Sequence, residues 1–247
     1  MNTRFTLAEV IFGSAIVLLL AAIAPLAAEQ AAETAKLTAC ADNLRQIGSA
    51  EHAYAADNKS FIAIGVTAFI REGGCVRAAT YNGDTSPMLL INKGYLKIEN
   101  KPAATVAERR ERFFRCPEDE VNFSKVVSGW KPPYPTISYQ YCWFTTQQGL
   151  AKNSYPRKLK PEQDDNYGLR ANIDRDDPGW YIFSDLMKAT SRKWVMLPDD
   201  KAKSNHFEAL NCLYLGGHVK SHVITEAHEK HVTQGVNRFT LFYEDVE

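Results

Sequence analysis

Glu9 is the residue whose position most needs a chemical explanation, because it stands at the start of a long apolar segment. Residues 10–28 contain no charged side chain. About 19 apolar or small residues are enough to cross a hydrocarbon core of roughly 30 Å. A carboxylate carried into such a core costs on the order of a few kcal/mol unless it is paired. The sequence therefore predicts a membrane-crossing segment that begins with a carboxylate in need of a positive partner.

The other residues with obvious chemical potential are histidines and aspartates. All but one of the six histidines lie in the last quarter of the chain: His206, His218, His222, His228 and His231. In a strand, His218 and His222 would share a face but lie about 13 Å apart, too far for one ion. His228 and His231 are one helical turn apart and could share one. Hydrogen-bonding or solvated roles are the commoner fate of such histidines, so no metal site is predicted.

Several aspartates offer oxygen ligands for calcium, although their spacing matches no calcium-binding loop. They are Asp174, Asp176, Asp177, Asp199 and Asp200. We predict no cofactor, with calcium as the alternative left open.

The sequence lacks the motifs of common enzyme classes. It contains no Gly-x-Ser-x-Gly elbow, phosphate-binding loop, His-Glu-x-x-His pair or Gly-x-Gly-x-x-Gly fingerprint. The 29 basic and 29 acidic residues balance, so no excess positive charge indicates a nucleic-acid partner. We therefore predict a protein that is not an enzyme and does not bind nucleic acid.

Five scattered cysteines fit an oxidising compartment, and none forms a Cys-x-x-Cys pair typical of zinc or thioredoxin-like sites: Cys40, Cys75, Cys116, Cys142 and Cys212. An odd number leaves at least one thiol unpaired within the chain. The sequence does not determine the connectivity. Our working expectation pairs Cys40 with Cys116 and makes Cys142 and Cys212 neighbours. The alternative is that most are small buried hydrophobic residues.

Glu9, the apolar segment and Cys40 lie in a stretch of sequence whose pattern predicts one long helix. Beyond the apolar segment, apolar residues recur at helical spacing, at Leu37, Cys40, Leu44, Ile47 and Tyr54. This predicts one helix from near residue 5 to about residue 56, roughly 75 Å long, with a lipid-facing first half and an amphipathic second half. Pro25 removes one helical hydrogen bond, so a kink or a short melted stretch is expected there. About 190 residues remain, enough for one domain with its own core.

The N-terminal sequence Phe5-Thr6-Leu7-Ala8-Glu9, followed by the apolar helix, resembles type IV prepilins and type II secretion pseudopilins. The resemblance implies peptidase cleavage between Arg4 and Phe5, with methylation at Phe5. Arg4 stands where the family usually has Gly. It also implies that Glu9 pairs with the new N-terminal amine of a neighbouring subunit. The alternatives are a secretory signal peptide cut after Ala28 and a plain membrane anchor.

Three further segments strengthen this resemblance, and they are similar to the pseudopilin-like proteins of the Planctomycetes–Verrucomicrobia–Lentisphaerae group. The first is residues 40–48 with residues 54–58, which resemble a Cys-x-x-Asn-Leu-Lys-Gln-Ile-Gly…Tyr-Ala-x-Asp-Asn stretch. The second is the aromatic-x-Cys-Pro element ending at Cys116-Pro117. The third is His206, followed after nine residues by Gly216-Gly217-His218, which resembles a His-x9-Asp-Gly signature with Gly216 in place of the Asp.

The remaining pattern predicts a small sheet. Ser86-Pro87 opens a short helix that ends by Gly94, and residues 145–178 are polar and loop-like. Residues 210–215 and 218–223 flank Gly216-Gly217, which predicts a hairpin with a two-residue type I′ turn. Because both faces of residues 210–215 are mainly apolar, we expect this strand to be covered on both sides. Further strands are expected at residues 137–144 and 193–197.

The expected fold class is α+β and pilin-like, with the long N-terminal helix packed on a small antiparallel sheet. The expected organisation is a leader at residues 1–4, a membrane-spanning half-helix at 5–28, an amphipathic half-helix at 29–57 and an extracytoplasmic domain at 58–247. Arg4 on the short flank places the N-terminus in the cytoplasm. The resemblance implies a single-pass protein of the bacterial inner membrane, with its C-terminal domain periplasmic or extracellular.

The resemblance further implies a structural subunit of a type II secretion pseudopilus or a related type IV pilin-like filament. Its partners would be copies of itself or other pseudopilins, the prepilin peptidase, the inner-membrane platform of the secretion system and the lipid bilayer. The alternative is a membrane-tethered module that stays monomeric and binds glycans through aromatic side chains. The candidates for that role are Trp130, Tyr134, Tyr139, Tyr141, Trp143, Trp180 and Tyr181.

Overall fold

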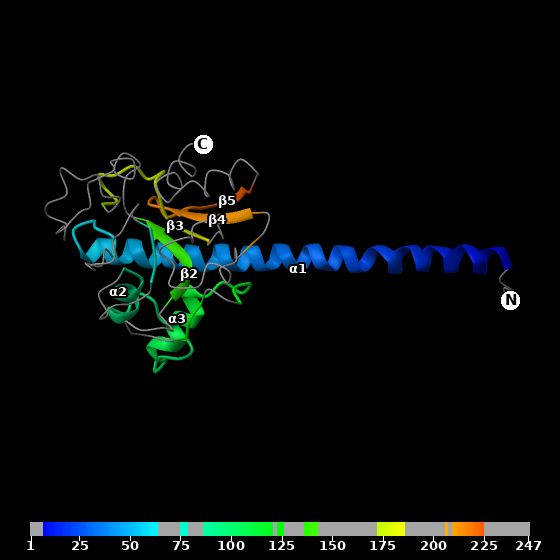
Figure 1. The fold of residues 1–247 in the computed structure, drawn as a ribbon, viewed down its shortest axis with the longest axis horizontal. Helices are drawn as coiled ribbons and strands as arrows, with labels where there is room; N and C mark the ends of the chain where they lie inside the picture. Colours follow the sequence, from blue (N-terminus) through cyan, green and yellow to red (C-terminus); the bar gives the residue numbers. More distant parts are fainter. Residues whose placement is uncertain are drawn as a thin grey trace, which may run out of the picture.

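A long helix and an antiparallel sheet organise the molecule (Figure 1). The computed structural model describes residues 7–63, 75–78, 86–120, 123–125, 136–142, 172–185, 206 and 209–224. One end of helix α1 (Leu7–Asp57) projects far from the rest of the protein, and its other end is surrounded by the sheet and two short helices. The α+β fold class is therefore confirmed.

Helix α1 has the extent that the sequence predicts within the described residues, and it is unbroken. Pro25 lies inside it, and because the helix is continuous there, the expectation of a melted stretch was wrong. A membrane-type helix tolerates proline when only one backbone hydrogen bond is lost and the flanking turns remain intact. Among the described residues, α1 is the one helix long and apolar enough to cross a membrane.

The sheet has five strands in the order β1-β2-β3-β4-β5, and every neighbouring pair is antiparallel. The strands are β1 (Cys75–Ala78), β2 (Thr136–Cys142), β3 (Tyr181–Asp185), β4 (Ala209–Tyr214) and β5 (Val219–Val223). β2 and the β4–β5 hairpin match the sequence predictions. β1 and β3 were not predicted, and residues 193–197 lie outside the described part of the chain.

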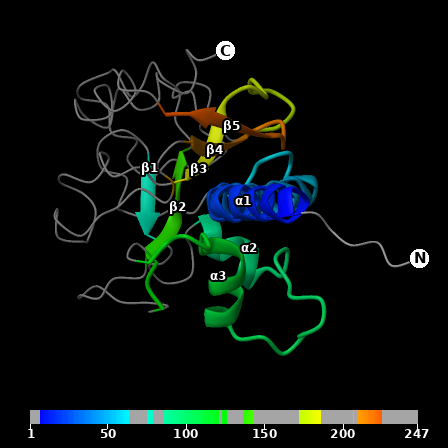
Figure 2. The same ribbon diagram turned by 90° about the vertical axis from the view of Figure 1, so that its right-hand side faces the viewer.

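The two short helices lie on a different side of α1 from the sheet (Figure 2). Helix α2 (Ser86–Asn92) was predicted, and helix α3 (Val106–Phe114) was not. α3 begins with a capping box, in which the Thr105 hydroxyl accepts from the Glu108 amide and the Glu108 carboxylate accepts from the Thr105 amide. Thr-x-x-Glu is a sequence signal for a helix start. α3 contacts both α1 and β2, and its Phe113 and Phe114 are buried.

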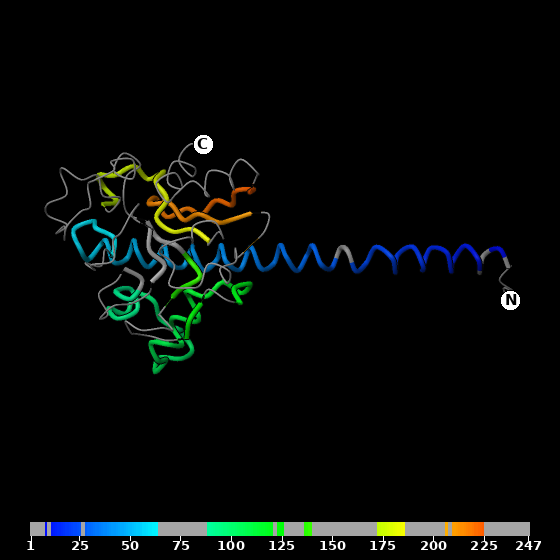
Figure 3. The backbone as a smooth tube through the Cα atoms, viewed as in Figure 1, coloured from blue at the N-terminus to red at the C-terminus, as the bar shows by residue number. Residues whose placement is uncertain are grey.

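The core lies between the second half of α1, the sheet and the short helices. Leu44 and Ile47 of α1 are buried together with Phe183 of β3 and Leu213 of β4. Gly48 lets the helix approach β4 closely, because a Cβ atom at this position would lie 2.7 Å from Leu213 Cδ1. The β4–β5 hairpin runs alongside α1 (Figure 3).

The hairpin turn differs from the predicted type I′ turn by one residue. Tyr214 N donates to His218 O at 2.9 Å and Gly217 N donates to Tyr214 O at 2.8 Å, so the loop has three residues, 215–217. Only Gly217 has a positive φ, of 84°. This is the pattern of a three-residue hairpin loop with a left-handed final residue. Gly216 is required for space instead, since a Cβ there would lie 2.9 Å from Pro178 Cβ.

Candidate functional site: a buried disulfide, histidine and carboxylate

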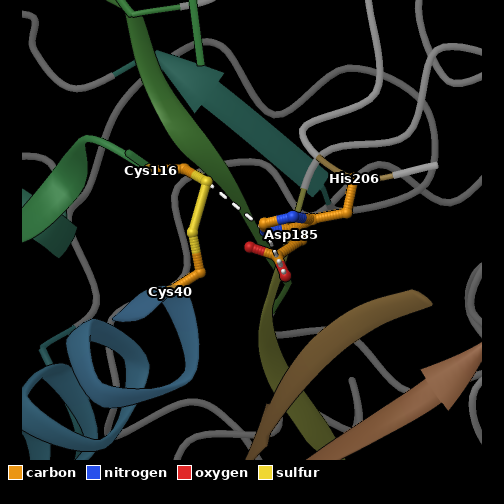
Figure 4. Close-up of side chains that lie close together, drawn as sticks. All are labelled: Cys40, Cys116, Asp185 and His206. Carbon is orange, nitrogen blue, oxygen red and sulfur yellow. Dashed lines mark hydrogen bonds and ion pairs between the residues drawn. A yellow bond between two sulfur atoms is a disulfide. The ribbon is translucent and has the colours of Figure 1, made fainter. Parts of the chain in front are cut away.

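Four side chains of types that can bind a metal ion come from four separate segments and meet inside the domain (Figure 4). They are Cys40 of α1, Cys116 just after α3, Asp185 at the end of β3 and His206 shortly before β4. One ligand-type atom from each lies within 4.8 Å of those of the other three, and all four residues are buried. We call this group the Cys–His–Asp cluster.

Cys40 and Cys116 form a disulfide, in the pairing expected from the sequence. Cys40 lies one helical turn before Leu44 on the buried face of α1, and both residues are fully inaccessible to solvent. Cys116 follows α3 directly, so the burial of Phe113 and Phe114 brings it against α1. The bond spans 76 residues of sequence, and closing a loop of this length stabilises a fold by about 4 kcal/mol in the chain-entropy model.

His206 lies between the disulfide and two carboxylates. Its Nε2 is 3.4 Å from Cys116 Sγ and 3.7 Å from Asp185 Oδ2, and its Nδ1 is 2.8 Å from Glu118 Oε2. An ionised carboxylate only accepts hydrogen bonds, so Nδ1 carries the proton that is donated to Glu118. Nε2 is thereby directed at the sulfur atoms and Asp185.

Glu118 is held in turn by Lys36 of α1, whose Nζ lies 2.8 Å from Glu118 Oε1. Burial by itself raises the pKa of Glu118, but the hydrogen bonds and charges of Lys36 and His206 outweigh it and lower that pKa below its ordinary value of 4.5. Glu118 is therefore ionised near neutral pH. The chain Lys36–Glu118–His206 fixes the orientation of the imidazole ring.

Asp185 is oriented by Asn211 on the neighbouring strand β4. Its Oδ2 accepts from the Asn211 backbone amide at 2.8 Å and from Asn211 Nδ2 at 2.9 Å. The second hydrogen of Nδ2 bonds to Leu37 O of α1 at 3.0 Å, and Ser221 Oγ of β5 donates to Asn211 Oδ1 at 2.5 Å. Asn211 thus ties Asp185 to α1 and to the hairpin.

Asn43 joins α1 to the chain around Cys116 in the same way. Its Nδ2 donates to Arg115 O and to Tyr139 Oη, each at 3.2 Å, and Arg112 donates to its Oδ1 at 2.9 Å. Tyr139 is completely buried, and that burial raises the pKa of its hydroxyl well above the ordinary value. Tyr139 therefore stays neutral and hydrogen-bonded.

The remaining cysteines do not follow the expected arrangement. Cys212 is a free, buried cysteine of β4, and β3 separates it from Cys142 of β2. The expectation that Cys142 and Cys212 are neighbours was wrong, because the strand that intervenes was not recognised in the sequence. In the register, Cys142 is opposite Cys75 of β1. Burial raises the pKa of the Cys212 thiol well above its ordinary value, with a further contribution from the charge of Asp185.

The processing residues are described only in part. Arg4 and Phe5 lie outside the described residues, and Glu9 is placed in α1 without a described side chain.

The histidines of the hairpin gather around a tyrosine. The ring of His218 stacks on Tyr214 with 4.6 Å between centroids, and His222 Nε2 lies 2.7 Å from Tyr214 Oη. His228 and His231 lie outside the described residues.

The acidic turn that was considered for calcium is occupied by its own hydrogen bonds. Asp176 Oδ2 accepts from the Asn172 amide at 2.9 Å, and Asp177 Oδ1 accepts from the Gly179 amide at 2.8 Å. Asp174 accepts from the Ser60 hydroxyl. Asp199 and Asp200 lie outside the described residues.

The aromatic residues considered for glycan binding are partly in the core. Tyr139 and Tyr181 have no exposed surface, so their inclusion in a sugar-binding face was wrong. All five residues of β3 are buried, so this strand is covered on both faces, which the alternation of the sequence alone does not reveal. Trp130, Tyr134 and Trp143 lie outside the described residues.

Sequence reasoning missed Asp185, Glu118 and Asn211 as parts of the cluster. Two signals were present: residues 181–183 form an aromatic and aliphatic run that ends two residues before Asp185, and Glu118 follows the Cys116-Pro117 pair directly. Asn211 lies within the strand predicted at residues 210–215.

The three segments that carry the sequence resemblance meet at the cluster: Cys40 comes from the first, Cys116 from the second and His206 from the third. The hairpin of the third segment also reaches α1, where His52 Nε2 lies 2.9 Å from Leu215 O. In comparisons with protein-family models, curated proteins and solved structures, nothing matches this chain.

Proposed function

We propose that the protein is a structural subunit of a type II secretion pseudopilus or a related type IV pilin-like filament. In this proposal the first half of α1 lies in the bacterial inner membrane and the rest of the protein is extracytoplasmic. Copies of the chain or other pseudopilins, the prepilin peptidase and the inner-membrane platform would be its partners.

The observation that carries the proposal is the solvent exposure of apolar side chains in the first half of α1, in contrast to the burial of apolar side chains in its second half. Large apolar side chains of its first half are exposed, with Phe12 at 72%, Leu18 at 71% and Leu19 at 66%. They are distributed around the helix, so a single groove of a soluble partner would leave many of them in water. Lipid and neighbouring copies of the same helix would cover all sides.

The position of Glu9 supports assembly in particular. A carboxylate at the start of an apolar helix is tolerated when a positive group pairs with it. Cleavage before Phe5 would create such a group, the amine of the mature N-terminus. In a filament, the amine of one subunit could lie beside Glu9 of the next and so define the stagger between subunits.

The test is substitution Glu9→Ala in the full chain, expressed with its secretion system. We expect membrane insertion to persist, because the apolar segment is unchanged, and filament assembly to be abolished. Cell fractionation reports insertion, and electron microscopy with crosslinking reports assembly. Glu29→Ala is the matched control, since Glu29 is exposed on the same helix beyond the apolar segment. Normal filaments from the Glu9→Ala protein would refute the proposed role.

The mature N-terminus provides a second, independent test. Terminal sequencing of the membrane-bound protein should begin at Phe5. A start at Glu29 would indicate a secretory signal peptide, and a start at Met1 a plain anchor; either result contradicts processing as a prepilin.

A further inference from the structure

We propose that the Cys–His–Asp cluster is a zinc site in the reduced protein, in which Cys40, Cys116, Asp185 and His206 bind one ion in place of the disulfide. The same four residues would thus hold α1, the α3 connection, β3 and the start of the hairpin together in two alternative ways. This inference is independent of the proposed filament function.

The donor set is the first argument. Zinc takes thiolate, imidazole and carboxylate ligands in tetrahedral sites, at about 2.0–2.3 Å from the ion. In such a tetrahedron the donor atoms are about 3.3–3.8 Å apart. Here two sulfur atoms, one imidazole nitrogen and one carboxylate oxygen already lie within 4.8 Å of one another. Small rotations of the cysteine side chains would then be enough to surround an ion.

The orientation of His206 is the second argument. Metal-binding histidines usually donate their other ring N–H to a carboxylate or carbonyl, which fixes the tautomer and directs the free nitrogen at the metal. Glu118 accepts from His206 Nδ1 at 2.8 Å, and Nε2 faces Cys116 Sγ and Asp185. Asp185 is held by two amide donors of Asn211. Both nonsulfur ligands are therefore oriented by outer partners.

The charge of the reduced cluster is the third argument. Cys40, Cys116 and Asp185 are fully inaccessible to solvent. Zinc binds cysteines as thiolates, and two thiolates beside a carboxylate would place three negative charges in a site with little water, so without a cation the reduced cysteines stay neutral thiols. A zinc ion offsets two of these charges. Oxidation to the neutral disulfide removes two of them by a different route, so disulfide and metal are mutually exclusive ways to stabilise the cluster.

Conversion of the disulfide form into the zinc-bound form requires two electrons and two protons, which a dithiol reductant supplies. Its two electrons and two protons break the Cys40–Cys116 bond and give two thiols, and the dithiol leaves as its own disulfide. Zinc binding then releases the two thiol protons to solvent as the zinc–sulfur bonds form.

The experiment uses the full chain in detergent, reduced with a water-soluble phosphine and titrated with Co²⁺ as a spectroscopic probe. We expect one Co²⁺ per chain, with sulfur-to-cobalt charge-transfer absorption and the intense visible bands of a tetrahedral site. Zn²⁺ should displace it. The oxidised protein should bind no Co²⁺ at this site, because its sulfur atoms are bonded to each other.

Matched variants separate this site from other histidines and thiols. His206→Ala and Asp185→Asn should each weaken binding by about tenfold or more, and Glu118→Gln by about 10–100-fold without loss of the sulfur-to-cobalt band. The controls are His222→Ala, which changes a histidine bonded to Tyr214, and Cys212→Ser, which removes a free, buried thiol. Both controls should bind Co²⁺ as the unaltered chain does.

Three results would overturn the proposal: no stoichiometric Co²⁺ binding by the reduced chain, equal binding by the His206→Ala protein, or loss of binding in both controls. Reduction by itself could unfold the domain, so thermal unfolding is measured with and without Zn²⁺. We expect Zn²⁺ to raise the melting temperature of the reduced chain and to leave that of the His206→Ala chain nearly unchanged. An unchanged melting temperature in the reduced parent chain would also refute the site.

Discussion

Residues 7–36 and residues 37–57 form one uninterrupted helix, yet their surroundings differ. Every described side chain between residues 8 and 36 is exposed, whereas Cys40, Leu44 and Ile47 are completely buried. Helical hydrogen bonds are local and form equally well in both halves. The C-terminal part of α1 is therefore covered by the rest of this chain, whereas the described side chains of its first part are not.

The second half of α1 is also fixed by specific polar contacts. Glu51 Oε2 accepts from the Ala63 amide at 2.7 Å, and Asn43 and His52 bond to the chain near α3 and to the hairpin. Such contacts determine the rotation and axial position of a helix, because each partner must be met at hydrogen-bonding distance. Apolar contact with lipid imposes no such register.

A matched pair of leucine substitutions should give the largest contrast in stability between the two parts of α1. Leu44→Ala removes a fully buried side chain, so the free energy of unfolding should fall by about 2–5 kcal/mol. Leu18→Ala alters a side chain that is 71% exposed and should change it by less than about 0.5 kcal/mol. Urea unfolding in detergent measures both. Equal losses would mean that the first half is packed within the domain.

A pair of glycine substitutions on the same helix should give the next largest contrast. Gly48→Ala places a Cβ 2.7 Å from Leu213 Cδ1, whereas a Cβ at Gly13 meets nothing within 4 Å. Overpacking costs about 1–3 kcal/mol, and the gain in helix propensity returns up to about 1 kcal/mol. We expect net destabilisation by about 1–2 kcal/mol for Gly48→Ala and none for Gly13→Ala. Stabilisation by Gly48→Ala would contradict a close contact between α1 and β4.

Substitutions at Gly217 test how much the contact between the hairpin loop and α1 contributes to stability. Gly217 has a φ of 84° and a Cβ there would lie 3.1 Å from His52 Nε2. Gly217→Val should destabilise the domain by about 1 kcal/mol or more, because a β-branched residue resists positive φ. Gly217→Asn, which tolerates this conformation better, should cost less. Thermal unfolding of the two variants compares them; an equal loss would assign the effect to the contact with His52 alone.

The smallest expected effect is a pH dependence of α3, which contacts α1, α2 and β2. Hydrogen bonds from Lys101, then from the Thr105 amide and hydroxyl, lower the pKa of Glu108 from 4.5 to about 2. A lowered pKa means that the ionised form is favoured by folding. Its contribution is therefore complete above pH 4.5 and is lost as the pH falls from 4.5 towards 2.

Glu108→Gln should remove this acid-dependent contribution, while glutamine preserves the capping-box geometry. The difference in urea midpoint between the variant and the parent chain should shrink from about pH 6 to about pH 3. A difference that stays constant over this range would show that the charge of Glu108 does not stabilise the fold.

Parts of the fold were predictable because their signals are local. The periodic apolar residues identified α1, the Ser86-Pro87 start identified α2, and the paired glycines identified the β4–β5 hairpin. The capping box of α3 was available in the sequence and was overlooked. β1 has four residues and β3 has five, and strands this short leave too little periodicity for recognition without their neighbours.

Local sequence patterns predicted a long helix with an apolar first part, a core-facing stripe on its second half and a tight turn near Gly217. These features follow from side-chain type and spacing within one or two turns of backbone. The Cys40–Cys116 pairing was expected from the sequence, but its meeting with Asp185 and His206 depends on strand order and on the rotation of α1 against the sheet. Such contacts join residues up to 166 positions apart, and no local pattern encodes the packing that brings them together.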